Sequence, residues 1–317
     1  MLIAFVHSGR SFMPEVSAYI KYFSARNIAC VVTTPGKLKN INCDVEWFFL
    51  GMDHSKPKKA VVRIHEYTSL STPPAARLKD YIKHKINTTP DFRIFLNKFV
   101  AERMGFNDGV PFGFRDMGIP QNLLVTPFPL RKKTVDFIYI GDVGAQRQMD
   151  ALLGQFTKDA WKDKSILIIS QHYSKLAQRF KNYRNIVFKG PLSHDAVMDE
   201  LQTARYALNY IPDIAPFNRQ TSTKLLEYAA GKIPIISTSY QWITEFRAAN
   251  GGDYFFLEPS FGNFNWEAVS NFNYSFPDLS NWTWDQQIER SGVLQFLQTR
   301  FPAADPGFGQ SPAGTLL

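Results

Sequence analysis

The chain has 317 residues, of which 44% are hydrophobic, 15% aromatic and 20% charged, a composition typical of a globular protein and not of a disordered one. Lysine and arginine number 36 and aspartate and glutamate 28, so the formal net charge is +8 and favours anionic partners: nucleic acid, an acidic membrane surface or phosphate-bearing ligands. Apolar runs are far shorter than the roughly 20 residues that span a bilayer, and two cysteines exclude a disulfide framework or a four-ligand zinc site.

The first half predicts short strands alternating with helices. Met1–Arg10 lacks the basic start and the cleavage site of a signal peptide and is typical of a first strand, so we expect a cytoplasmic protein. The expected strands are Leu2–Val6, Ile28–Val32, Val45–Leu50, Ala60–Ile64 and Asp91–Phe95. The expected helices are Pro14–Arg26, Pro74–Lys85 and Asn97–Met104, followed by a Gly/Pro-rich loop at Gly105–Pro120.

The second half repeats this alternation. Its expected strands are Val135–Ile140, Ser165–Ser170, Asn185–Phe188, Tyr206–Tyr210, Ile233–Ser237 and Tyr254–Leu257. Its expected helices are Met149–Phe156, His172–Phe180, a helix capped by Ser193, Thr221–Ala230 and Tyr240–Ala249.

Such alternation predicts the α/β class, with two Rossmann-like, doubly wound domains facing a central cleft and a ligand at the carboxyl ends of the parallel strands. We expect the first domain at residues 1–130 and the second at 131–280, with Pro127–Lys133 as a linker. Residues 301–317 have no periodicity and are expected to be a disordered tail.

The segment after Tyr210 carries the strongest indication of chemistry. Thr221, Ser222 and Thr223 open a helix that also bears Lys224 and Glu227. Free backbone N–H groups, hydroxyls, the helix dipole and the lysine together suit a diphosphate, and Glu227 could accept the hydroxyls of a ribose. A simple capped amphipathic helix with a solvated Lys–Glu pair is an equally good interpretation.

The run KLLEYAAGKIPIIST that begins at Lys224 resembles the donor-binding signature of GT-B glycosyltransferases of the family 4 type. Three further segments are similar to that family, in the same order: YIGDVGAQRQMDALLGQF, YRNIVFKGPLSHD and NWTWDQQIERSGVLQFL. The last resembles a closing helix, here 281–300, that packs back toward the first domain. The resemblance covers most of residues 135–297.

The resemblance implies a role for each matching residue. Glu227 would bind the ribose, and Ser222 and Thr223 the diphosphate. Gly141 matches the glycine after the first strand, and Arg147 the phosphate-binding lysine. The backbone near Gly190 would meet the base.

Two positions depart from the family pattern. Arg219 stands where the family has the first of two paired glutamates, which approaches the sugar, and Asp142 stands where it has a phosphate-neutralising arginine. Arg219 could supply the missing charge from its loop. The signature therefore supports nucleotide-diphosphate binding better than it supports any particular sugar.

The first half offers fewer candidates. Gly9 follows the first strand and permits close approach to a phosphate, although an ordinary turn explains it as well. His65 and Glu66 are expected to end a strand at the same edge. In the family a histidine there lies near the donor sugar, so we assign His65 and Glu66 to catalysis, with a structural histidine and a surface charge as the alternatives.

The sequence lacks the motifs of several other classes of function. The histidines form no metal-ligand cluster, so no metal or other cofactor is expected, and no nucleic-acid motif accompanies the basic stretches. Lys56–Lys59 and Lys79–Lys85 suit peripheral contact with the anionic inner face of a membrane, although most basic stretches are solvated faces.

These observations predict a metal-independent, retaining glycosyltransferase. It would transfer a sugar from a nucleotide-diphosphate donor, with UDP-hexose as the expected donor, to a glycan or lipid-linked acceptor in cell-surface polysaccharide or lipopolysaccharide synthesis. The alternative is a non-catalytic GT-B-like module that binds a nucleotide sugar or a glycan within a larger assembly.

Overall fold

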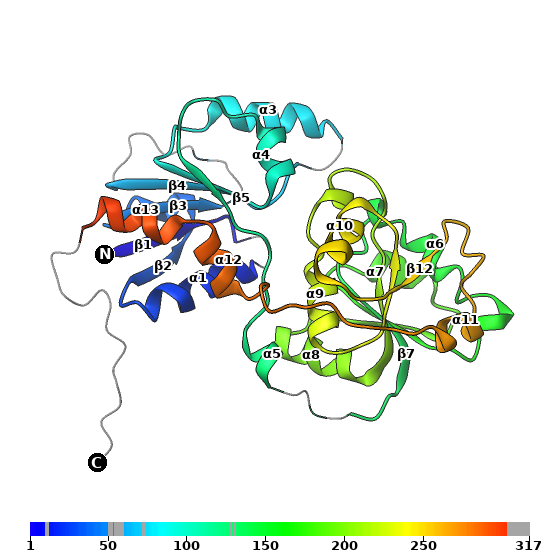
Figure 1. The fold of residues 1–317 in the computed structure, drawn as a ribbon. Helices are drawn as coiled ribbons and strands as arrows, with labels where there is room; N and C mark the ends of the chain where they lie inside the picture. The colour runs from blue at the N-terminus through cyan, green and yellow to red at the C-terminus, as the bar shows by residue number, and fades with distance from the viewer. Residues whose placement is uncertain are drawn as a thin grey trace, which may run out of the picture. The chain divides into compact units, whose positions relative to one another are not determined.

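The computed structural model of this chain describes residues 1–9, 13–49, 53, 60–71, 74–126, 129 and 131–302. The chain folds into two compact units (Figure 1). Unit 1 comprises Met1–Gly118 and Thr283–Leu317, and unit 2 comprises Ile119–Trp282. The C-terminal segment thus belongs to the same unit as the N-terminal one.

Unit 1 is built on a six-stranded sheet in the order β2-β1-β3-β4-β5-β6, in which all neighbours are parallel. Its strands are β1 Leu2–Val6, β2 Ala29–Thr33, β3 Val45–Phe49, β4 Val62–Tyr67, β5 Phe92–Phe95 and β6 Phe112–Phe114. Its helices are α1 Pro14–Ser24, α2 Pro35–Leu38, α3 Ala76–Ile86, α4 Lys98–Met104, α12 Trp284–Arg290 and α13 Val293–Arg300.

The core of unit 1 joins both ends of the chain. Phe5, Trp47 and Ile64 of the central strands are fully buried in one cluster with Ile288 and Leu297 of the C-terminal helices. Parallel strands are usually covered on both faces, and β3 and β4 are buried at every position, polar residues included.

Unit 2 contains a second parallel sheet, in the order β12-β11-β10-β7-β8-β9. Its strands are β7 Val135–Ile140, β8 Ile166–Ile169, β9 Ile186–Lys189, β10 Ala204–Asn209, β11 Ile235–Thr238 and β12 Phe255–Leu257. Its helices are α5 Asn122–Val125, α6 Met149–Leu153, α7 Ser174–Arg179, α8 His194–Thr203, α9 Thr223–Ala230, α10 Gln241–Asn250 and α11 Trp266–Asn271, with 3-10 turns η1 Ala145–Arg147, η2 Asp159–Trp161 and η3 Phe217–Arg219.

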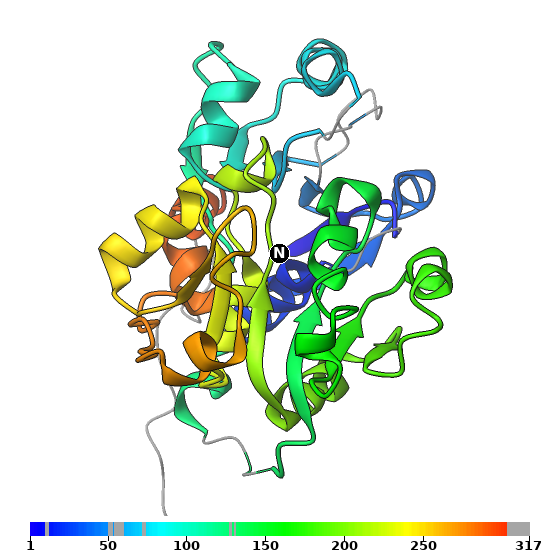
Figure 2. The same ribbon diagram turned by 90° about the vertical axis from the view of Figure 1, so that its right-hand side faces the viewer.

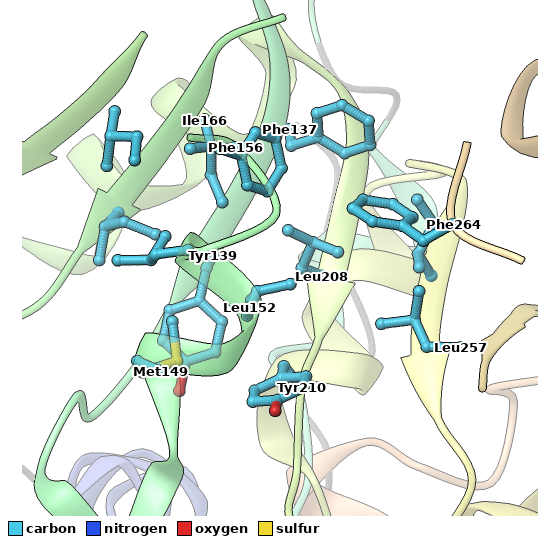
Figure 3. Packing of buried hydrophobic residues seen from close by; sticks show 14 of the residues in the cluster. Phe137, Tyr139, Met149, Leu152, Phe156, Ile166, Leu208, Tyr210, Leu257 and Phe264 are labelled. Atoms are coloured by element: carbon cyan, nitrogen blue, oxygen red, sulfur yellow. The ribbon is translucent and has the colours of Figure 1, made fainter. Parts of the chain in front are cut away.

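A dense aromatic and aliphatic core fills one side of this second sheet (Figure 3). Phe137 of β7 lies among Phe156, Trp161 and Phe264, with ring centroids 5.3–5.8 Å away. Leu208 of β10 belongs to the same cluster. This core fixes the strands whose ends carry the site.

The expected α/β class with two Rossmann-like domains is confirmed, and three local predictions are wrong. Gly105–Pro120 contains the edge strand β6, whose alternation is too short to be detected. β4 runs on to Tyr67 instead of ending at Ile64. The closing helix is two helices, because Gly292 adopts a left-handed backbone (φ +70°) between α12 and α13.

Other predictions fall wholly or partly outside the described residues. These are Lys56–Lys59, most of the tail 301–317, and part of the Pro127–Lys133 segment.

Each sheet changes winding direction at one place. In unit 1 the change lies between β1 and β3, and in unit 2 between β7 and β10. β7 and β10 pair directly, with Ile138 opposite Ala207, and Figure 2 shows them side by side in green and yellow-green. The loops that leave neighbouring strands in opposite directions open a crevice at such a point, where ligands of doubly wound sheets bind.

Candidate functional site

A cavity of about 230 Å³ lies in unit 2 at the carboxyl ends of β7 and β10. Strand ends, η3 and the start of α9 contribute to its wall. The lining residues are Tyr139, Ile140, Gly141, Asp142, Arg147, Leu208, Asn209, Tyr210, Ile211, Phe217, Gln220, Thr221, Ser222, Thr223, Lys224 and Tyr228. The cavity therefore occupies the winding switch point of this sheet and brings together five predicted donor-binding residues: Gly141, Arg147, Ser222, Thr223 and Lys224.

The loop after β7 forms one wall of the cavity. Gly141 has φ +149°, a backbone conformation that side chains with a Cβ rarely adopt. The hydroxyl of Tyr139 donates a hydrogen bond to the carbonyl of Asp142 (2.7 Å), and the Asp142 carboxylate accepts one from the amide of Gly144 (3.0 Å). The loop is thus held by its own hydrogen bonds while its carboxylate lines the cavity.

Arg147 supplies positive charge from η1. Its guanidinium carbon lies 4.2 Å from the centroid of the Phe217 ring, in a cation–π contact between two different loops. Its Nε lies 3.7 Å from Oδ2 of Asp142. The ring of Phe217 therefore holds the guanidinium of Arg147 in position, and the carboxylate of Asp142 offsets part of the positive charge of Arg147.

The start of α9 is held by a buried polar network. The hydroxyl of Ser222 accepts a hydrogen bond from the amide of Leu225 (3.3 Å) as the N-cap and donates one to Oδ1 of Asn209 (2.6 Å). The side-chain amide of Asn209 donates to Ser237 (2.9 Å) and to Tyr240 (3.0 Å). The Ser222 hydroxyl proton is therefore already donated to Asn209. The half-buried Thr223 and the amides of the first turn are better suited to bind an anion.

Glu227 lies one turn further along α9 and is 5% exposed. It accepts hydrogen bonds from Lys224 (2.7 Å) and from His194 of α8 (3.2 Å). Burial alone would raise the pKa of Glu227, but Lys224 and His194 outweigh it and lower the pKa below the ordinary value. The group is therefore a carboxylate at neutral pH, with lone pairs beyond those its partners use.

Three predicted donor residues of unit 2 do not line the cavity: Glu227, Arg219 and Gly190. Arg219 ends η3 with an exposed side chain. Gly190 follows β9, and a Cβ there would lie 2.3 Å from the carbonyl oxygen of Ser170, so close packing of β9 against β8 is enough to explain this glycine.

The predicted residues of the first half lie in unit 1. Gly9 follows β1 with φ +72°, and its amide donates to Nδ1 of His7 (3.1 Å). His65 is not at the end of a strand but inside β4, with 0% exposure, and its Nε2 lies 3.3 Å from Oδ2 of Asp53. Burial lowers the pKa of His65 more than Asp53 raises it.

Glu66 is not a surface charge, because it is 0% exposed. Its carboxylate pairs with the buried Arg115 and accepts a hydrogen bond from the indole of Trp47 (2.8 Å). Burial raises the pKa of Glu66 although Arg115 opposes this. Both predicted catalytic side chains therefore have buried partners inside unit 1, which favours a structural role for them.

Several residues that organise the site were not predicted from the sequence. His194 of α8 contacts the carboxylate of Glu227. Asn209 is hydrogen-bonded to Ser222, Ser237 and Tyr240. The ring of Phe217 makes a cation–π contact with Arg147. Only Asn209 had a signal in the sequence, since a polar residue at the end of a buried strand is unusual.

Two features are absent from the part of the chain that the structure describes. No three histidine, cysteine, aspartate or glutamate side chains gather there as metal ligands. No helix within those residues is both long and apolar enough to cross a bilayer.

Comparison with known proteins gives similarity in structure alone. No protein-family model matches the sequence, and no curated protein matches it. Among solved structures, sucrose-phosphate synthase from Thermosynechococcus elongatus aligns with a TM-score of 0.66 at 10% identity, over 96% of this chain and 100% of that one. AviGT4, a glycosyltransferase involved in avilamycin A biosynthesis, aligns at 0.62 and 12% identity, over 96% and 99%.

A third similar structure has a different activity. The UDP-GlcNAc 2-epimerase of Methanocaldococcus jannaschii, solved with UDP-GlcNAc and UDP, aligns with a TM-score of 0.53 at 13% identity, over 93% of this chain and 100% of that one. These similarities show that the chain has the GT-B fold, with a Rossmann-like domain on each parallel sheet.

Proposed function

We propose that this GT-B chain is a glycosyltransferase that binds a nucleotide-diphosphate sugar in the cavity of unit 2. The observation that carries the proposal is the cavity at the switch point between β7 and β10, which combines Arg147, Lys224 and the first turn of α9. Two cations and a helix N-terminus at the carboxyl end of a parallel sheet are what a nucleoside diphosphate requires.

In this proposal the chain acts by stabilising the leaving diphosphate. Arg147 and Lys224 carry positive charge, and Thr223 and the amides that begin α9 donate hydrogen bonds to phosphate oxygens. Glu227, held as a carboxylate, accepts the ribose hydroxyls. Such fixed donors lower the barrier because they need no rearrangement when charge develops on the leaving group.

We further propose UDP-hexose as the donor, retention of configuration, and a glycan or lipid-linked acceptor. The donor part is supported by similar structures solved with UDP ligands, such as the epimerase with UDP-GlcNAc and a trehalose-6-phosphate protein of E. coli with UDP-2-fluoro glucose. Transfer and acceptor class rest on the sequence resemblance described above.

A second candidate is a non-catalytic module that binds a nucleotide sugar or a glycan. The observation that favours it is the carboxylate of Asp142 among the cavity residues, 3.7 Å from the Arg147 cation, where it repels a diphosphate.

Titration calorimetry with UDP, GDP and ADP and their sugars tests both candidates, followed by donor-hydrolysis and acceptor-panel assays. Glycosyltransfer to any acceptor supports the enzyme, whereas tight binding with no turnover supports the module. Lys224→Ala should weaken UDP binding roughly tenfold or more, because a charge-assisted hydrogen bond is lost. Lys175→Ala, which removes an exposed lysine of α7, is the matched control. Absence of nucleotide binding would reject both candidates.

A further inference from the structure

Helix α3 presents its large apolar side chains to solvent and packs Asp80 and His84 against the protein. Leu78 is 58% exposed, Tyr81 60%, Ile82 43% and Ile86 38%. Their spacing of three and four residues places them on one face of the helix. Most surface helices have the opposite arrangement.

The inner face of α3 carries polar side chains that contact neighbouring segments of unit 1. Asp80, 3% exposed, accepts a hydrogen bond from the amide of Ser71 (3.0 Å) and pairs with Arg103 (3.8 Å). Nδ1 of His84 lies 2.9 Å from the carbonyl oxygen of Met104, and its ring stacks on Phe106 with centroids 4.6 Å apart. These contacts fix the rotation of α3, so the apolar face is a built feature of the fold.

The exposed charges on α3 itself have one sign. Arg77, Lys79, Lys83 and Lys85 lie on α3, and its single acidic residue is the buried Asp80. Nζ of Lys85 lies 5.6 Å from the centroid of the Tyr81 ring, so a cation stands among the apolar side chains. The partner of this face must therefore be apolar and anionic at once.

We propose that the outer face of α3 docks on a bilayer surface that contains anionic lipids. A short helix with apolar side chains on one face and lysines beside them lies in the plane of the lipid headgroups, with its apolar side chains among the acyl chains. Tyrosine and lysine suit this boundary because each has an apolar body and a polar end.

The size of the face favours a bilayer over a protein partner. A helix of eleven residues is ~16 Å long and ~10 Å wide. A stable protein interface buries about 800 Å² on each partner, several times what such a strip offers. α3 also lies on the outside of unit 1, beside α4 (Figure 1). This inference does not depend on the proposed function of unit 2.

Flotation of the purified full chain with lipid vesicles tests the proposal, without nucleotide or acceptor. We expect the chain to float with vesicles of phosphatidylcholine and phosphatidylglycerol and to bind at least tenfold less to phosphatidylcholine alone. Binding should fall as salt is raised, because part of the attraction is electrostatic.

Two double variants separate the contributions of charge and apolar contact. Lys79→Gln with Lys85→Gln should lower binding roughly thirtyfold, at about 1 kcal/mol for each charge. Leu78→Ser with Ile82→Ser should lower it at least tenfold, because two exposed side chains no longer enter the bilayer. The matched controls, Lys21→Gln with Lys37→Gln and Leu124→Ser with Val125→Ser, alter exposed residues elsewhere and should bind as the original chain does.

Three outcomes would overturn the proposal. The first is no flotation with anionic vesicles, and the second is an equal loss in the α3 variants and their controls. The third is binding of poly-L-glutamate as tight as that of vesicles and insensitive to Leu78→Ser with Ile82→Ser, which would assign α3 to an acidic protein. Thermal unfolding of each variant verifies that unit 1 remains folded.

Discussion

Nζ of Lys224 lies 2.7 Å from Oε2 of Glu227, so the lysine predicted for the diphosphate and the glutamate predicted for the ribose form one ion pair on α9. His194 approaches the other carboxylate oxygen at 3.2 Å. In the proposed complex, Lys224 would bind the diphosphate and Glu227 the ribose. Because the two side chains form an ion pair, the position of each depends on the other.

Glu227→Gln should weaken UDP binding roughly tenfold or more, because hydrogen bonds that involve a charged group contribute about 1.5–3 kcal/mol. Glutamine keeps the size of the side chain but can no longer hold Lys224 as an ion pair. Calorimetry with UDP measures the effect, with Glu245→Gln on the exposed face of α10 as the control. Equal affinities of the two variants would mean that the ribose does not lie at Glu227.

Asp142→Asn should strengthen UDP binding. A carboxylate about 5 Å from a phosphate costs about 1 kcal/mol at an effective dielectric constant between those of protein and water, or roughly fivefold in affinity. Asparagine retains an oxygen that can accept from the amide of Gly144, so the loop should keep its shape. The exposed Asp163→Asn serves as the reference for the change in net charge. Weaker binding in the Asp142 variant would instead identify the carboxylate as a ligand contact.

Phe217→Ala should lower UDP affinity about threefold to thirtyfold, because a cation–π contact of about 0.5–2 kcal/mol no longer holds Arg147 in the cavity. Phe217→Tyr keeps the ring and should bind as the original chain does. Calorimetry measures the UDP affinity of both variants and of a double variant that combines Phe217→Ala with Arg147→Ala. If Phe217 acts through Arg147, its removal should have little effect once the arginine is gone.

The stability of unit 1 should fall as the pH is lowered below 6.5, the ordinary pKa of histidine. Burial lowers the pKa of His65, so between the lowered value and 6.5 the unfolded chain binds a proton that the folded chain does not. The stabilisation is complete above 6.5 and is lost as the pH falls through the folded pKa. Urea unfolding between pH 7.5 and 5 measures this.

His65→Gln should flatten that pH dependence, and His172→Gln, at an exposed histidine, should leave it intact. If His65→Gln instead abolished glycosyltransfer with the urea midpoint and its pH dependence unchanged, His65 would be catalytic and not structural.

Gly113→Ala should destabilise unit 1 by about 1–3 kcal/mol, as overpacking does in a closed core. A Cβ at Gly113 of β6 would lie 1.9 Å from the carbonyl oxygen of Ser291, so the end of α12 would have to move. Gly36→Ala is the control, because no atom lies within 4 Å of a Cβ there. Equal urea midpoints would show that the C-terminal segment does not pack on β6.

Much of this protein can be predicted from its sequence, because hydrophobic periodicity is a local property. The run Val135–Ile140 forms β7 with the predicted bounds, and Ser193 caps α8 through its hydroxyl as expected. The start of α9 could be identified for the same reason, since a cap, a lysine and a glutamate on consecutive turns depend only on spacing along one helix.

Relations between distant segments were decided only by the tertiary structure. That β7 pairs with β10 brings Arg147 to Phe217 and closes the cavity, and no local pattern states the order of strands in a sheet. Periodicity also says which residues are apolar but not what covers them. His65 and Glu66 are buried, whereas the large apolar side chains of α3 are exposed. The sequence could not show this, because the burial of a side chain depends on elements that pack on it from elsewhere in the chain.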